Sequence, residues 1–141
     1  MVDQATRILY ETALSGAPVP WQAVETPKGG AVFGGASPLG WVFITPRVGQ
    51  LASAIAAAVN AYAALVLDET PPGIFGPTQW RDVWAAYPLP WRAEAFGDLQ
   101  VLFFDADGDH LGWCQPGDSA TARLIQDAVA WAAAYPAHGA R

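Results

Sequence analysis

Residues 48–67 read VGQLASAIAAAVNAYAALVL and contain no charged side chain over twenty positions. The large residues Leu51, Ile55, Val59 and Tyr62 recur at helical spacing, so we expect one helix over about 48–66. Its opposite face is almost entirely alanine and would let a second backbone approach closely. The pattern predicts a buried central helix, packed between a sheet and another helix or between two copies of the chain.

Twenty uncharged residues are also long enough to cross a bilayer. The segment is mostly alanine, which is nearly neutral for membrane insertion, and it includes Gln50, Ser53 and Asn60. This composition favours a core helix, and we expect a soluble protein with no membrane segment. Residues 1–7 have neither the basic nor the apolar region of a signal peptide, which favours a cytoplasmic location.

The segments around this helix predict the remaining elements. Strands are expected at 21–26, 31–33 and 40–45 before the helix, and at 91–96, 98–104 and 109–114 after it. Further helices are expected at 3–15, from Thr78 to Tyr87, and from about Asp118 to Tyr135. Asp107 and Gly108 form a strong hairpin signal between the last two strands.

Helices and strands therefore come in blocks rather than in strict alternation, which favours an α+β fold with an antiparallel sheet. We expect a single domain over residues 1–141, with about 4–6 strands, the central alanine-rich helix, and N- and C-terminal helices. Residues 137–141 are expected to form a frayed tail. The sequence suggests no linker and no internal repeat.

The composition excludes several classes of function. The chain has 141 residues, a net charge of −6 and only 14% charged residues, so an unfolded chain is excluded. No basic stripe is present to neutralise phosphates, and we expect no nucleic-acid binding. Cys114 is the single cysteine and there are two histidines, so neither a disulfide nor a zinc site is expected. We expect no cofactor.

Motifs for catalysis are also lacking. His110 and Cys114 are expected on one strand face, but roughly 13 Å apart at about 3.3 Å per residue, too far for a nucleophile–base pair. The sequence has no Gly-x-Ser-x-Gly motif and no phosphate-binding loop motif. Glu94, Asp98 and the hairpin aspartates remain as acid–base candidates without a partner. The sequence favours a non-enzymatic role over an enzyme of unrecognised class.

Two clusters supply candidate binding residues. One is an aromatic stripe on the short helix beside an irregular loop, and the other is an acidic hairpin turn. The stripe either packs on the sheet or lines a ligand groove or interface, since Trp and Tyr dominate interface hot spots. The turn resembles the start of a calcium loop but has His110 and Pro116 where Gly and Glu are needed, which favours a solvated turn. The candidates are Phe75, Trp80, Trp84, Tyr87, Asp105, Asp107 and Asp109.

Residues 95–108 read AFGDLQVLFFDADG and precede a strand and a terminal helix. This arrangement resembles the hairpin-plus-helix ends of some SUKH-type immunity domains. The resemblance covers about a quarter of the chain, and the N-terminal half departs from the family's pattern. It implies a cytoplasmic protein that blocks a cognate toxin.

Taken with the acidity and the many tryptophans, these features predict a small bacterial protein that binds a protein partner. An immunity or inhibitor protein against a basic toxin or effector fits this description, because opposite charges speed association. One alternative is a binder of apolar small molecules, with a pocket under the Pro-Pro-Gly loop at residues 71–73. A homo-oligomer through the alanine-rich helix is a further possibility.

Overall fold

The computed structural model describes residues 2–26, 29–34, 37–42, 50–69, 80–97, 100–114 and 119–139, and every structural statement below concerns these residues. Four helices and six strands form in this order: α1 (Gln4–Gly16), β1 (Trp21–Thr26), β2 (Gly29–Gly34), β3 (Ser37–Val42), α2 (Leu51–Asp68), α3 (Arg81–Ala86), β4 (Arg92–Phe96), β5 (Gln100–Phe104), β6 (His110–Cys114) and α4 (Ser119–Gly139).

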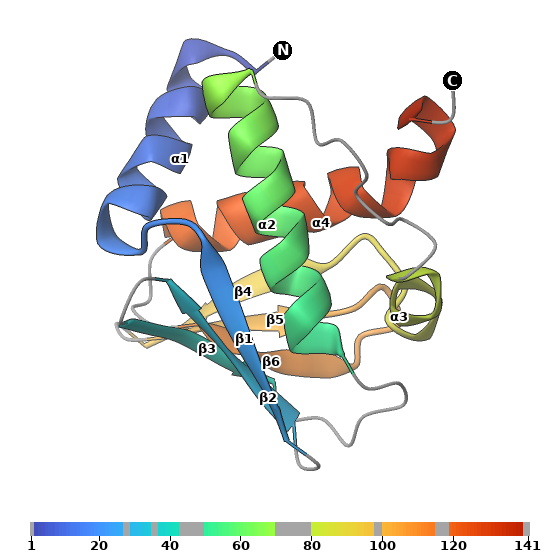
Figure 1. The fold of residues 1–141 in the computed structure, drawn as a ribbon. Coiled ribbons are helices and arrows are strands. Elements are labelled where there is room, and N and C mark those ends of the chain that lie inside the picture. Colours follow the sequence, from blue (N-terminus) through green and yellow to red (C-terminus); the bar gives the residue numbers. More distant parts are fainter. Residues whose placement is uncertain are drawn as a thin grey trace.

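The strands form one antiparallel sheet in the order β1-β2-β3-β6-β5-β4. Its two halves meet at β3 and β6, where Gly40 pairs with Cys114 and Trp41 with Trp113. The long helices α1, α2 and α4 lie together on one side of this sheet (Figure 1). The predicted α+β fold is therefore confirmed, and the number of strands lies within the predicted range.

Helix α1 begins where its sequence predicts. The carboxylate of Asp3 accepts a hydrogen bond from the backbone N–H of Thr6 at 2.7 Å. This capping bond satisfies one of the free donors at the helix start and lowers the pKa of Asp3. The helix then presents Tyr10 and Ala13 to the core.

Helix α2 is the predicted central helix. It packs on β1 and β2 on one side and on α4 on another, and ten of its residues are buried: Leu51, Ala52, Ala54, Ile55, Ala56, Ala58, Val59, Tyr62, Ala63 and Val66. By length and by its mean hydropathy of 1.6 it could cross a membrane, as one helix among the described residues. In this fold it packs against the sheet and α4, as a core helix does. Most of its alanines are packed within the chain, whereas Ala57, Ala61 and Ala64 are partly exposed, so contact with a second copy stays a prediction.

The chain consists of two successive units with the same order of elements. The first unit is α1-β1-β2-β3-α2 and the second is α3-β4-β5-β6-α4, and the sheet order is symmetric about the pairing of β3 with β6. An approximate two-fold axis therefore passes through this seam. The expectation that the chain has no internal repeat was wrong.

The start of the first strand is built in the same way in both units. The indole N–H of Trp21 donates to the carbonyl of Ala17 at 2.8 Å, and that of Trp91 donates to Tyr87 at 3.0 Å. Each acceptor is the residue at the C-terminal end of the preceding helix. A cis X-Pro bond precedes each tryptophan. The segments 17–21 and 87–91 are therefore equivalent.

The long helix of each unit holds the same tryptophan by its backbone. The amide of Asn60 on α2 donates to the carbonyl of Trp21 at 3.0 Å, and the amide of Gln126 on α4 donates to that of Trp91 at 3.1 Å. Each bond satisfies the carbonyl of a tryptophan at an edge of the sheet, where no further strand supplies a donor. The pairing of helix and strand is thus repeated as well.

The strand register extends this equivalence across the sheet. The pairing of β2 with β3 shifts after Val32, with Leu39 as the extra residue in β3, and the pairing of β5 with β6 shifts after Phe103, with Leu111 as the extra residue in β6. Counting from these bulges, Phe33 is equivalent to Phe104, and Trp41 is equivalent to Trp113. Both tryptophans end a Leu-Gly-Trp triplet, at 39–41 and 111–113.

Candidate functional site

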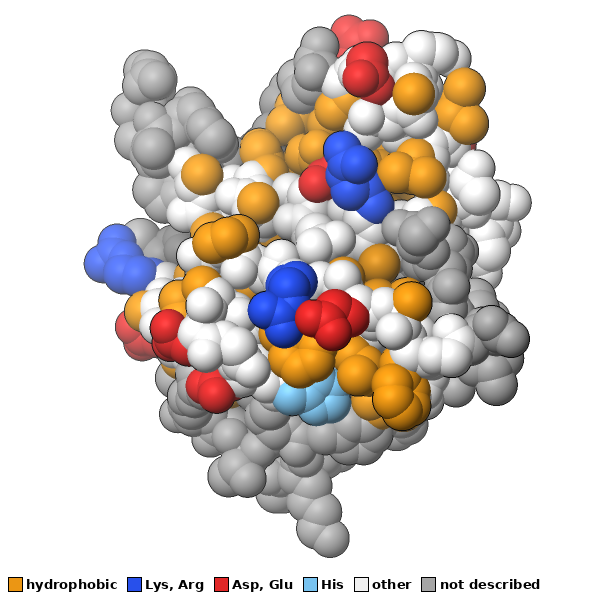
Figure 2. Space-filling view, turned by 180° about the vertical axis from the view of Figure 1, so that it is seen from behind, with side chains coloured by type: hydrophobic (Ala, Val, Ile, Leu, Met, Phe, Trp, Pro, Cys, Tyr) orange, Lys and Arg blue, Asp and Glu red, His pale blue; other side chains and the backbone are white. Residues whose placement is uncertain are grey.

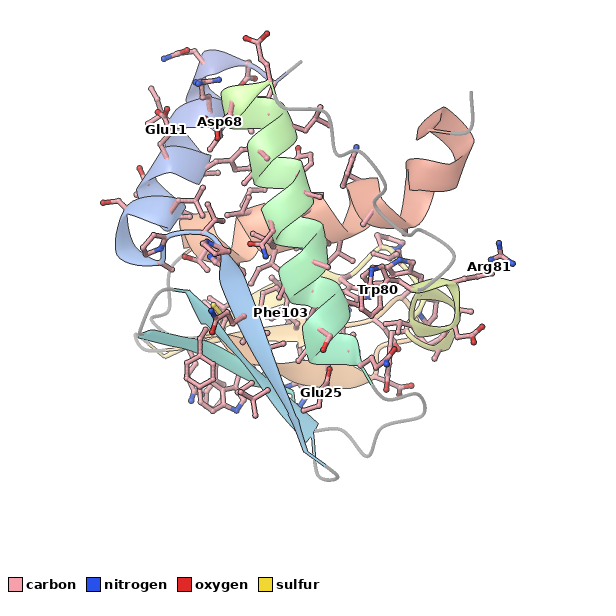
Figure 3. All side chains as sticks on the ribbon, in the orientation of Figure 1. Glu11, Glu25, Asp68, Trp80, Arg81 and Phe103 are labelled. Atoms are coloured by element: carbon pink, nitrogen blue, oxygen red, sulfur yellow. The ribbon has the colours of Figure 1, made fainter. Side chains whose placement is uncertain are left out.

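The predicted aromatic stripe lies in the core. Trp80, Trp84 and Tyr87 are at most 9% exposed. Figure 3 shows Trp80 between α3 and the first turns of α2. The three side chains pack inside the fold, so they are not exposed anchors of an interface, and their role in lining a ligand groove stays a prediction. Phe75, the remaining candidate of this cluster, lies outside the described residues.

One donor in this core has no acceptor. The indole Nε1 of Trp84 is buried and makes no hydrogen bond, whereas that of its neighbour Trp91 donates to Tyr87. The two indole rings lie 6.2 Å apart, edge to face. Buried donors are nearly always satisfied, so this N–H marks a place where a further acceptor would fit.

This difference gives a matched pair of substitutions. Trp91→Phe and Trp84→Phe remove similar volumes from the same cluster, but only the first removes a hydrogen bond. We expect Trp91→Phe to lower the free energy of unfolding by about 1 kcal/mol more than Trp84→Phe. Urea denaturation of both variants measures the difference. Equal losses would show that the bond from Trp91 contributes nothing.

The acidic hairpin turn is organised by one buried carboxylate. Asp105 is 1% exposed, and its Oδ1 accepts from the backbone N–H groups of Asp107 at 2.9 Å and Asp109 at 3.0 Å. Gly108 has a φ of +88°, which a side chain would disfavour. The carboxylates of Asp107 and Asp109 are exposed. Asp105 therefore stabilises the turn, and its buried carboxylate is not accessible to a partner.

No group of three His, Cys, Asp or Glu side chains suited to a metal ion occurs in the part of the chain that the structure describes. The turn thus gives no support to a calcium site. Its two exposed aspartates add negative charge to this end of the sheet.

Substitution of Asp105 tests the structural role of the turn. We expect Asp105→Ala to lower the free energy of unfolding by about 2 kcal/mol, because two backbone donors of the turn lose their acceptor. Asp107→Ala, in the same turn but exposed, should change it by less than about 0.5 kcal/mol. Thermal and urea unfolding of both variants provide the comparison. Equal effects would contradict the assignment.

His110 and Cys114 lie on opposite faces of the sheet. The bulge in β6 places His110 opposite Phe104, whereas Cys114 pairs with Val101 and is buried towards the helices. The expectation that they share one face was wrong, because it assumed a regular strand. The conclusion that they form no nucleophile–base pair holds, since a sheet separates them.

The face of the sheet that carries no helix is the candidate binding surface. Side chains alternate along each strand, and those not directed to the helices form what we call the open sheet face. Val24 and Phe96, near its two edges, are 52% and 63% exposed. Figure 2 shows hydrophobic side chains around the histidine and an Arg–Glu pair on this side. Its partly or fully exposed described side chains are Gln22, Val24, Phe33, Arg92, Glu94, Phe96, Gln100, Leu102, Phe104, His110 and Trp113, whereas Ala31 on the same side is buried.

The charges within this face neutralise each other. The guanidinium of Arg92 lies 4.8 Å from the centre of the Phe104 ring, and its Nε contacts the Glu94 carboxylate at 2.6 Å. Both charged residues come from β4 and lie two positions apart, on the same side of the sheet. The open face thus holds a planar cation between an aromatic ring and a carboxylate.

Polar groups also meet within the helix layer. Tyr10 donates from its hydroxyl to the carboxylate of Asp127 at 2.5 Å, and lies 2.8 Å from the hydroxyl of Tyr62. Arg123 contacts the same carboxylate at 2.8 Å. Burial raises the pKa of both tyrosines above the usual value of 10.0. The cluster joins α1, α2 and α4 and fits a structural role, because both phenols are buried.

The open sheet face was not predicted from the sequence. In the segment 100–104, large apolar residues occupy both alternating positions, so no polar side marks the exposed face. One signal for this face was present in the sequence: the aromatic residues Phe104 and Trp113 recur as Phe33 and Trp41 at the equivalent positions of the first unit. Comparison of the chain with family models, curated proteins and solved structures gave no match.

Proposed function

We propose that this chain is a bacterial, cytoplasmic protein that acts by binding another protein through its open sheet face. The observation that carries the proposal is a six-stranded sheet with its long helices on one side and exposed apolar side chains on the other. Soluble monomers rarely expose a contiguous apolar patch without a binding role. Aromatic side chains such as Phe96 and Trp113 are typical anchors of interfaces.

The charge of the chain favours a basic partner. The net charge is −6, and the Arg92–Glu94 pair on the edge strand β4 adds no excess charge to the open face. Asp107 and Asp109 add negative charge at its end. An apolar centre with acidic surroundings attracts and then holds a basic surface. An immunity or inhibitor protein that neutralises a basic toxin or effector fits this combination.

Site-specific photocrosslinking in the source organism tests the proposal. A benzophenone amino acid at Val24 or Phe96 samples the two edges of the open face, and the same group at Ile8 samples the helix layer at a matched exposure of 51%. We expect one protein to be crosslinked from both open-face positions and not from Ile8. Crosslinks from Ile8 alone, or none from the open face, would refute the proposal.

A second candidate is the binding of an apolar small molecule, favoured by the unpartnered indole N–H of Trp84. A ligand carrying a carbonyl or ether oxygen would satisfy this donor. The loop at 71–73, expected to cover the pocket, lies outside the described residues. Native mass spectrometry of the purified protein tests this candidate. A retained ligand that Trp84→Phe loses would support it, and a ligand-free mass for the wild-type protein would oppose it.

A further inference from the structure

We propose that the basic partner docks an arginine side chain on Phe33, in the place that corresponds to Arg92 on Phe104. This inference rests on the proposed function, and it names the side chain and the position that would define recognition. Its starting point is the arrangement within the second unit, where the guanidinium of Arg92 already stacks on an aromatic ring of the open face.

The first unit repeats the ring but not the cation. Phe33 pairs with Gln22 across β1 and β2, as Phe104 pairs with Arg92 across β4 and β5. Val24 stands where the second unit has Glu94. Phe33 is partly exposed, and no ring or cation of the described residues stacks on it. An external guanidinium would therefore meet an aromatic ring that is partly exposed and that no described residue covers by stacking.

Charge determines which occupant fits this ring. A second copy of the chain would bring a further −6 and be repelled, whereas a basic partner is attracted. Arginine fits better than lysine, because a planar, weakly hydrated guanidinium stacks on an aromatic ring and an ammonium remains more strongly hydrated. A positively charged partner segment that places one arginine over β2 thus matches both the charge and the shape of this position.

Capped tetra-arginine and tetra-lysine amides serve as probes for the test. Isothermal titration calorimetry should give tetra-arginine an affinity about threefold higher than that of tetra-lysine, as expected for one exposed cation–π contact. Chemical shift changes in β1 and β2 should accompany binding of tetra-arginine. The variant Phe33→Leu should bind both peptides equally, since it keeps the apolar contact but loses the ring.

A charge-neutral variant tests the position itself. Gln22→Arg with Val24→Glu copies the Arg92–Glu94 pair onto Phe33 and leaves the net charge at −6. We expect it to lose the preference for arginine, because its own guanidinium covers the ring. The matched control is Thr12→Arg with Ile8→Glu on the exposed side of α1, which is also charge-neutral and should keep the preference.

The outcomes separate this inference from the proposed function. Equal binding of the two peptides by the wild-type protein, or an unchanged preference in Gln22→Arg/Val24→Glu, would overturn the arginine position. If the protein without these substitutions is still crosslinked to a partner from Val24 and Phe96, the open face binds a protein, and only the inference fails. If those crosslinks are also absent, the proposed function fails with it.

Discussion

Replacing Gly30 with valine should lower the free energy of unfolding by about 3 kcal/mol, as expected for overpacking a filled core. A Cβ atom at Gly30 would lie 2.8 Å from the Cβ of Ala52 and 3.0 Å from the carbonyl of Val24. Valine is the natural residue at the equivalent position of the second unit, Val101. The same position thus accepts valine under α4 and excludes it under α2, because α2 approaches the sheet more closely.

Two further variants isolate the cause. Gly30→Ala should cost about 2 kcal/mol. Combined with Ala52→Gly, which removes the opposing Cβ, it should cost less than the sum of the two single changes. Gly16→Ala is the matched control, since a Cβ there meets nothing within 4 Å and should change stability by less than about 0.5 kcal/mol. Urea unfolding of the wild type, Gly30→Val, Gly30→Ala, Ala52→Gly, the Gly30→Ala/Ala52→Gly double variant and Gly16→Ala measures these differences. A Gly30→Val variant as stable as the wild type would contradict this packing.

The helices and strands follow from local pattern to a large extent. The uncharged alanine-rich segment predicted α2, and a strong Asp-Gly signal predicted the turn between β5 and β6. These features depend on neighbours within a few residues. The two bulges do not, because they arise from pairing between strands, and the one in β6 moved His110 to the face opposite Cys114.

The duplication could not be read from the chain because little identity remains. The shared signals are Pro-x-Pro-Trp at 18–21 and 88–91 and Leu-Gly-Trp at 39–41 and 111–113, which differ in their spacing by two residues. Helix α1 has 13 residues and α3 has 6, so the first elements of the two units do not align. Only the strand register brings the equivalent positions together.

The burial of the aromatic stripe could not be predicted for a related reason. Helical spacing indicates that Trp80, Trp84 and Tyr87 share one face, but it does not indicate what covers that face. In the structure the fold covers it. The open sheet face was hidden because Leu102 and Phe104 are as apolar as their buried neighbours. Deciding which side of a strand meets solvent needs the position of the helices, which is a tertiary property.

Tyr10→Phe should lower the free energy of unfolding by about 3 kcal/mol at neutral pH, since it removes a hydrogen bond to a charged group and an acceptor for a second buried phenol. Tyr10 gives its single proton to the Asp127 carboxylate, so the hydroxyl of Tyr62 must donate to Tyr10. Tyr62→Phe is the matched control, because it leaves the bond to Asp127 in place. We expect it to cost about 1 kcal/mol. Equal losses from the two variants would contradict this order of donors.

The same cluster predicts a loss of stability in alkali. Burial raises the pKa of Tyr10 and Tyr62 above 10.0, so the folded chain keeps both protons where the unfolded chain releases them. Their stabilising effect is complete below pH 10 and declines as the pH rises further, at up to about 1.4 kcal/mol per pH unit for each tyrosine. Urea midpoints at pH 8, 10 and 11 should fall less steeply for Tyr10→Phe than for the wild type. Parallel curves would mean that Tyr10 does not titrate between the two states, and the alkaline sensitivity would then belong to other groups.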